Sequence, residues 1–176
     1  MDDLELTISR MCLDNDDGGQ KTLDALQAAL DTCKSSPEAT ARVLEFYKYY
    51  ASVARRINDR CREVHLRLLT FIQAEPCTEA EIDGDEYEGD DLHLLSDDEK
   101  AAIVIDIRTR NARLEAFIIA HGALDRCISE LEDHVLFNPL DYGTLYDMTD
   151  EALGQLDMLE DKMSVLEASA GSERSV

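Results

Sequence analysis

Hydrophobic residues recur at alternating steps of three and four between residues 35 and 74, which is the spacing of a helical heptad. The stretch opens with Ser36-Pro37-Glu38, where the serine can cap free amides and the proline suits the first helical position. No further glycine or proline occurs before Glu75-Pro76, which predicts the end of the helix. The hydrophobic seam consists of Val43, Tyr47, Tyr50, Ala54, Ile57, Cys61, Val64, Leu68 and Phe71.

A second stretch, from residue 96 to residue 137, repeats the same spacing. It begins with Ser96-Asp97-Asp98-Glu99, an S-x-x-E capping box, and ends before Asn138-Pro139. Two helices of similar length joined by one connector predict an antiparallel hairpin. The second seam consists of Ile103, Ile107, Arg110, Leu114, Phe117, His121, Leu124, Ile128, Leu131 and Val135.

The two seams also predict a register. Antiparallel coiled coils set an a position against a d position, so facing residue numbers should sum to about 178. On this register His121 faces Ile57, and Arg110 faces Leu68. Contacts centred on a sum near 171 or 185 would place the register about one heptad away.

Shorter patterns flank the hairpin. Between Glu75 and Glu99 the chain has twelve acidic residues and no Lys or Arg, which is typical of a solvated linker. Thr149 is expected to cap a last helix. We therefore expect short N-terminal helices over 1–34, the hairpin over 35–137 with an acidic, flexible connector at 75–95, an irregular linker over 138–148, a C-terminal amphipathic helix over 149–168, and a frayed tail over 169–176. The predicted fold class is all-α: an elongated antiparallel coiled-coil helical hairpin with short N-terminal helices and a separate C-terminal helix.

The helices carry more hydrophobic residues than a two-helix seam covers. Each large apolar side chain contributes roughly 1.5–3 kcal/mol when fully buried, so a dozen left in water would forfeit more than a typical domain's stability. We therefore expect a protein partner, itself helical, or a homo-oligomer. The residues expected to bind it are Leu44, Phe46, Tyr49, Val53, Ile118, Ile119, Leu156, Leu159, Met163 and Leu166.

Composition narrows the class of protein. The 176 residues include 39 acidic and 17 basic side chains, with a formal net charge of −22, so we do not expect nucleic acid as a partner. No apolar run approaches the roughly 20 residues that span a bilayer, so we expect no membrane insertion. The five cysteines include no C-x-x-C pair, which is typical of reduced thiols in an intracellular protein, cytoplasmic or nuclear.

The sequence offers no catalytic residues. It has no glycine-rich phosphate loop, no G-x-S-x-G and no H-E-x-x-H, and we expect no cofactor and no metal. The rival hypothesis is an enzyme with a pocket inside a helical bundle, and a buried carboxylate cluster would support it. His121 and Arg110 are polar members of an apolar seam: either they form a register-fixing layer or buried ligand, or they are satisfied or solvent-reaching side chains.

Two further motifs have competing interpretations. Ser96, followed by three acids, is a candidate for phosphorylation by an acidophilic kinase, although the capping role explains the same residues. Seven cations on the first long helix can bind an acidic partner or pair with the protein's own acids. These are Arg42, Lys48, Arg55, Arg56, Arg60, Arg62 and Arg67.

We expect a non-enzymatic coiled-coil subunit or adaptor of an intracellular multiprotein assembly, of the cytoskeletal, chromosome-segregation or trafficking type. The alternative is an acidic chaperone that holds a basic client, such as histones, through residues 75–99.

Overall fold

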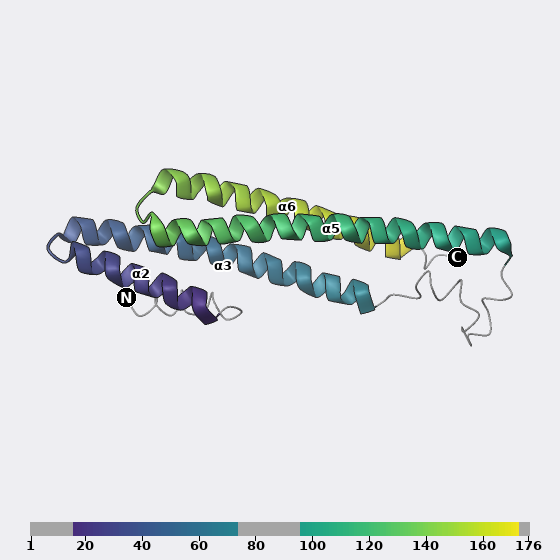
Figure 1. The fold of residues 1–176 in the computed structure, drawn as a ribbon, viewed down its shortest axis with the longest axis horizontal. Helices are drawn as coiled ribbons and strands as arrows, with labels where there is room; N and C mark the ends of the chain where they lie inside the picture. Colours follow the sequence, from purple (N-terminus) through teal and green to yellow (C-terminus); the bar gives the residue numbers. More distant parts are fainter. Residues whose placement is uncertain (1–15, 74–95, 173–176) are drawn as a thin grey trace. The chain divides into compact units, whose positions relative to one another are not determined.

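The computed structural model describes residues 16–73 and 96–172, and every element in these ranges is an α-helix (Figure 1). The prediction of an all-α fold is confirmed for this part of the chain. Residues 1–15 of the expected N-terminal helices, the connector at 75–95 and the end of the tail from residue 173 lie outside the described residues. The helices are α2 (Asp16–Cys33), α3 (Pro37–Gln73), α5 (Asp97–Phe137) and α6 (Tyr142–Ser172).

Local sequence signals determine both ends of the long helices. The Ala39 amide donates to Ser36 Oγ (3.3 Å), which is the predicted cap of α3. At the start of α5 the Glu99 amide donates to Ser96 Oγ (3.3 Å), and the Ser96 amide donates to Glu99 Oε2 (2.7 Å). This reciprocal pair is a capping box, as predicted. Helix α5 ends at Phe137, before Asn138-Pro139.

Helix α6 is longer than expected at both ends. Asp141 caps it, because the Thr144 amide donates to Asp141 Oδ1 (3.3 Å), so the helix begins at Tyr142. Thr149, the predicted cap, is instead buried within the helix and donates its hydroxyl to the Leu145 carbonyl (2.7 Å). The irregular linker predicted over 138–148 is therefore wrong for 142–148, and the frayed tail predicted from 169 is wrong up to Ser172.

Two other local features differ from expectation. Helix α2 begins at Asp16 and includes the glycine pair at 18 and 19, although glycine disfavours a helix interior. Four residues connect α5 to α6, and within them Leu140 adopts a left-handed backbone with φ of 76°. An L side chain adopts this conformation at a cost, so the short turn is conformationally strained.

The chain divides into two compact units. Unit 1 comprises Met1–Glu63 and Gly122–Asp157, and unit 2 comprises Val64–His121 and Met158–Val176. Helix α2 belongs to unit 1, whereas α3, α5 and α6 each contribute a segment to both. Each unit is described below by itself.

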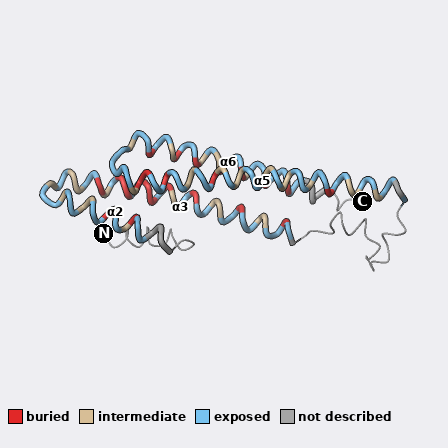
Figure 2. Tube along the Cα trace, in the orientation of Figure 1, coloured by how far each residue is buried: buried red, intermediate tan, exposed pale blue. Residues whose placement is uncertain are grey.

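In unit 1 the buried positions form stripes along the described helices (Figure 2). Helices α3 and α6 are neighbours that run parallel, because residue numbers rise together through their contacts. The Phe46 and Tyr142 rings meet edge to face at 5.2 Å, and the Tyr49 and Tyr146 rings at 4.8 Å. The core consists of Leu26, Val43, Phe46, Tyr47, Tyr50, Ala51, Val53, Ile57, Leu124, Leu131, Val135, Leu145, Ala152 and Leu156.

In unit 2 the core is smaller. Helices α3 and α5 run antiparallel there: His121 of α5 contacts His65, and Arg110 lies over the Phe71 ring. The predicted partners were Ile57 and Leu68, so the predicted register is wrong at both contacts, by eight and three positions in the same direction. A heptad pattern repeats, so it fixes the face of a helix but not its alignment along the partner. The core consists of Val64, Phe71, Ile107, Phe117, Leu159, Met163 and Leu166.

Candidate functional site: an exposed hydrophobic surface

Within the described residues, large hydrophobic side chains are exposed mainly in unit 2. Three more lie in unit 1: Phe137, Leu140 and Tyr146. Single exposed apolar residues are normal on a protein surface, whereas a large contiguous patch of them is typical of an interaction site. The eight in unit 2, which we call the unit 2 hydrophobic surface, are Leu66, Leu69 and Ile72 on α3, Ile105, Ile118 and Ile119 on α5, and Met158 and Val165 on α6.

The spacing of these residues follows helical geometry. Leu66, Leu69 and Ile72 are three residues apart and therefore lie along one stripe of α3. Ile105 and Ile119 are separated by two heptads and share one face of α5, whereas Ile118 points about a quarter turn away from Ile119. These side chains are 44–65% exposed, so each leaves about half of its surface in contact with water.

The structure places the ten predicted partner-binding residues very differently from one another. Leu44 and Tyr49 are half-buried, and only Ile118 and Ile119 are exposed. The reason is helix α6, which we expected to be separate but which packs its apolar stripe into the cores of both units. The six buried residues, which the chain itself covers, are Phe46, Val53, Leu156, Leu159, Met163 and Leu166.

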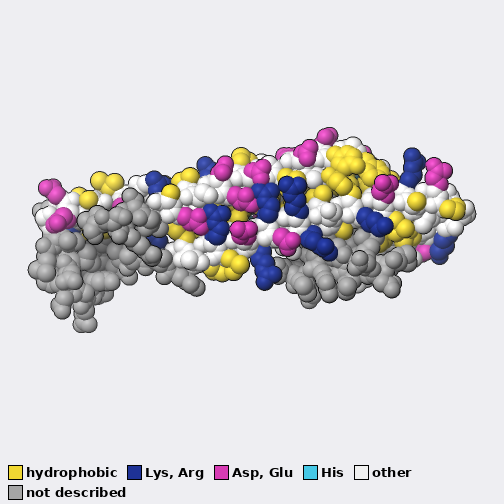
Figure 3. Space-filling view, turned by 180° about the vertical axis from the view of Figure 1, so that it is seen from behind, with side chains coloured by type: hydrophobic (Ala, Val, Ile, Leu, Met, Phe, Trp, Pro, Cys, Tyr) yellow, Lys and Arg dark blue, Asp and Glu magenta, His cyan; other side chains and the backbone are white. Residues whose placement is uncertain are grey.

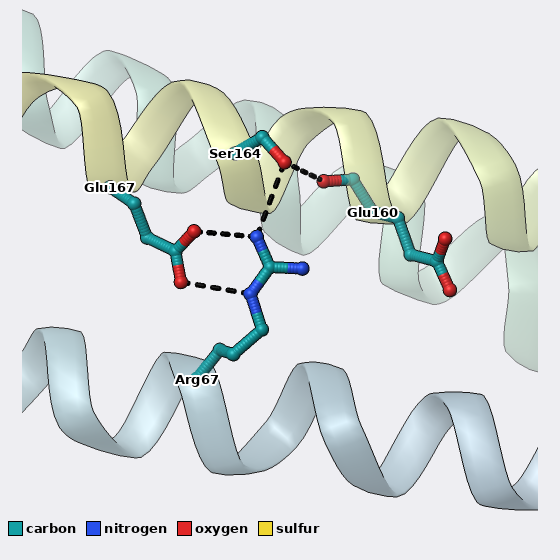
Figure 4. Close-up of polar contacts among 4 residues, drawn as sticks. All are labelled: Arg67, Glu160, Ser164 and Glu167. Atoms are coloured by element: carbon teal, nitrogen blue, oxygen red, sulfur yellow. Dashed lines mark hydrogen bonds and ion pairs between the residues drawn. The ribbon is translucent and has the colours of Figure 1, made fainter.

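Two of the seven cations on α3 pair with acids of α6. In unit 1, Arg60 forms an ion pair with Asp157 (2.5 Å). In unit 2, Arg67 makes a two-pronged contact with Glu167 (2.8 and 2.5 Å) and donates to Ser164 Oγ (3.2 Å) (Figure 4). Hydrogen bonds from Arg67 lower the pKa of Glu167. Arg60 and Arg67 therefore pair with the protein's own acids, which is one of the two alternatives that the sequence left open.

Charged side chains of both signs are interspersed with hydrophobic ones on the face drawn in Figure 3. This mixture contrasts with the single-sign field that polyanion binding would need. For the other cations of α3, binding of an acidic partner stays a prediction.

The two polar members of the α5 seam both have specific contacts in unit 2. The Arg110 guanidinium carbon lies 4.7 Å from the centre of the Phe71 ring, within cation–π range. His121 Nε2 lies 2.8 Å from His65 Nε2, and the Phe117 ring lies 6.4 Å from the His121 ring. Sequence reasoning missed the histidine pair, because 56 positions separate the two residues and the predicted register placed His121 elsewhere.

Cys33, Cys61 and Cys127 are half-buried, and none of the three forms a disulfide in the described part of the chain. Burial, followed by the charges of Glu151 and Glu130, raises the pKa of Cys127 and keeps it a thiol. This environment is that of a small hydrophobic residue rather than of a nucleophile.

At Ser96 the hydroxyl and amide both contact Glu99, and these hydrogen bonds lower the pKa of Glu99. The capping role is therefore present in the structure. Phosphorylation of Ser96 stays a prediction.

Within residues 16–73 and 96–172 the structure contains no group of three or more His, Cys, Asp or Glu side chains arranged to hold a metal ion. None of the helices in these ranges combines the length and hydrophobicity of a bilayer-spanning segment. Comparisons of the chain with models of known protein families, with curated proteins and with solved structures find no match. The functional argument therefore rests on the residues themselves.

Proposed function

We propose that the chain is a non-enzymatic subunit or adaptor of an intracellular multiprotein assembly, and that an amphipathic helix of a partner binds to the unit 2 hydrophobic surface. The observation that carries the proposal is the exposure of eight large apolar side chains on three helical segments of one unit. The antiparallel coiled-coil hairpin of α3 and α5 is part of this proposal, because long paired helices present such side chains in stripes.

The energy available is of the right size for specific binding. Covering the exposed half of each side chain contributes about 0.7–1.5 kcal/mol, half of the value for full burial. For the eight side chains together the gross gain is about 6–12 kcal/mol, which is an upper bound for a single partner helix because the eight lie on three helices, whereas a micromolar complex corresponds to about 8 kcal/mol. Since association and side-chain ordering oppose binding, the partner must contribute its own apolar residues.

The spacing of the exposed residues favours a helix as the occupant. Steps of three along α3 form a ridge that packs into the grooves of another helix. Recognition of an amphipathic helix by apolar anchors at such spacing is a recurring binding mode.

The test compares partner capture by three forms of the full chain. The binding variant is Ile118→Ser with Ile119→Ser, and the matched control is Asn111→Ser with Glu115→Gln, which alters exposed polar residues of the same helix segment. Quantitative mass spectrometry of each purified complex should show a stoichiometric partner retained by the wild type and the control and lost by the binding variant. Light scattering reports self-association at the same time.

Circular dichroism must show equal helicity in all three forms, since Ile118 and Ile119 are exposed and their loss should not unfold the chain. The proposal fails if the wild type is a monomer without a stoichiometric partner, or if its complex survives the binding variant.

A further inference from the structure

Two histidines on different helices of unit 2 meet through their ring nitrogens. His65 of α3 and His121 of α5 have their Nε2 atoms 2.8 Å apart, while their ring centres are 5.0 Å apart. The two Nε2 atoms are therefore much closer together than the two ring centres, which means that each ring points its Nε2 atom toward the other ring. One Nε2 carries the hydrogen and the other accepts it, because a neutral imidazole has one donor and one acceptor nitrogen.

Both rings are reachable from solvent. His65 is exposed and His121 is half-buried. The almost fully buried Phe117 ring lies 6.4 Å from the His121 ring on the same helix. Two adjacent imidazoles that water can reach are ligands that divalent transition metals bind well.

We propose that His65 and His121 bind a divalent transition-metal ion through their two Nε2 atoms and that the ion links α3 to α5. The distance favours neighbouring positions of a square-planar or octahedral ion. With metal–nitrogen bonds of about 2.0–2.1 Å, nitrogens at a right angle lie about 2.9 Å apart and nitrogens at a tetrahedral angle about 3.3 Å apart. The observed 2.8 Å matches the right angle, so the rings need only turn their lone pairs toward a common point.

Ni²⁺ and Cu²⁺ adopt such geometries and stand high in the usual order of affinity, whereas Zn²⁺ prefers a tetrahedron. The described residues supply no third His, Cys, Asp or Glu ligand, so water completes the coordination. Binding needs no net loss of a proton from a neutral pair, because the hydrogen on the one Nε2 moves to Nδ1 of the same ring.

A bound ion stabilises the folded chain, since the two histidines lie in different helices and come together only on folding. At a hundredfold excess over the dissociation constant the expected rise in melting temperature is about 5–10 °C for a chain of this length. This effect does not depend on the proposed partner surface, and its test needs no partner.

The experiment titrates the untagged, reduced full chain with NiCl₂ by isothermal calorimetry and repeats thermal melts with and without the ion. The variants are His65→Gln and His121→Gln, and the matched control is His134→Gln, which removes a histidine near the C-terminal end of α5. We expect a single site, at least tenfold weaker binding in either variant of the pair, and no change in the control. The rise in melting temperature should disappear with the same two substitutions and be reversed by a chelator.

The inference is overturned if the wild type and the double variant His65→Gln/His121→Gln bind Ni²⁺ equally, or if the wild type shows no binding at millimolar ion. Zn²⁺ provides a test of geometry, because binding tighter than that of Ni²⁺ would contradict the right-angled arrangement.

Discussion

Replacement of Tyr47 by phenylalanine removes one oxygen atom from the core of unit 1. The Tyr47 side chain is fully buried, and no polar atom of the described residues lies within hydrogen-bonding distance of its hydroxyl. Its ring contacts Phe46 edge to face, with ring centres 5.5 Å apart. A phenylalanine keeps the ring and this contact, so the substitution isolates the effect of the buried hydroxyl.

A buried polar group without a partner costs about 1–3 kcal/mol relative to its solvated state in the unfolded chain. We therefore expect Tyr47→Phe to raise the free energy of unfolding by about 1–3 kcal/mol at neutral pH. For a chain of this length the melting temperature should rise by about 2–4 °C for each kcal/mol.

The difference should grow in alkali. Burial raises the pKa of Tyr47 from 10.0 to about 12. Between these values the unfolded tyrosine loses its proton while the folded one keeps it, so the stability of the wild type falls as the pH rises. Phenylalanine does not titrate, and its advantage over the wild type should widen by about 2–3 kcal/mol between pH 10 and pH 12.

Urea unfolding followed by circular dichroism measures both effects, and equal slopes show that the two proteins unfold comparable surfaces. The matched control is Tyr142→Phe, because the Tyr142 hydroxyl donates to the Arg42 carbonyl (3.0 Å) and its loss should destabilise by about 0.5–1.5 kcal/mol. If Tyr47→Phe is no more stable than the wild type, the buried hydroxyl has a partner and the reasoning is refuted.

Three smaller perturbations follow from single contacts. Leu140→Gly should raise the free energy of unfolding by up to about 1 kcal/mol in urea titrations, because glycine adopts the left-handed turn without strain; a loss of stability would contradict this. Ser96→Ala should cost about 1 kcal/mol by removing the cap that Glu99 completes, and a cost below the error of thermal melts would show that the cap is immaterial. Arg67→Ala should lower the free energy of unfolding by less than about 1 kcal/mol, since the pair with Glu167 is partly exposed. This loss of stability should shrink in high salt, and it should vanish as the pH falls through the lowered pKa of Glu167. A cost that is unchanged in molar salt would instead point to packing by the Arg67 stem.

Local chemistry made the long helices predictable. The caps at Ser36 and Ser96 and the proline after Asn138 act within a few residues, so their effect does not depend on the rest of the fold. The start of α6 was missed because the cap at Asp141 stands next to a glycine and a proline-containing turn. These residues also suit irregular structure, and only packing of the following helix decides between the two.

Register lies beyond what a periodic pattern determines. Shifting one helix by a heptad keeps the same residue types on the seam, so the alternatives differ only in how particular side chains fit. In unit 2 the polar members of the seam lie where each finds a partner, His121 against His65 and Arg110 over Phe71. The predicted register opposed both to aliphatic side chains, whereas the observed contacts set His121 against a ring nitrogen and Arg110 over an aromatic ring.

The expected surplus of hydrophobic side chains depends on what helix α6 covers. The apolar stripe of α6 includes Leu156, Leu159 and Met163. From the sequence alone, this stripe cannot be told from one that binds another protein, because an amphipathic pattern indicates that a face is buried but not which chain buries it. Because α6 packs against the rest of its own chain, fewer apolar side chains stay exposed. Within the described residues, most of the exposed ones are in unit 2, to which α2 does not belong. Among the described residues, unit 2 contains segments of three helices and unit 1 segments of four, and fewer neighbours cover less of each helix, which is consistent with the exposure of Ile118 and Ile119. In the proposed complex, a partner helix would add a fourth helix to the three that the structure describes in unit 2.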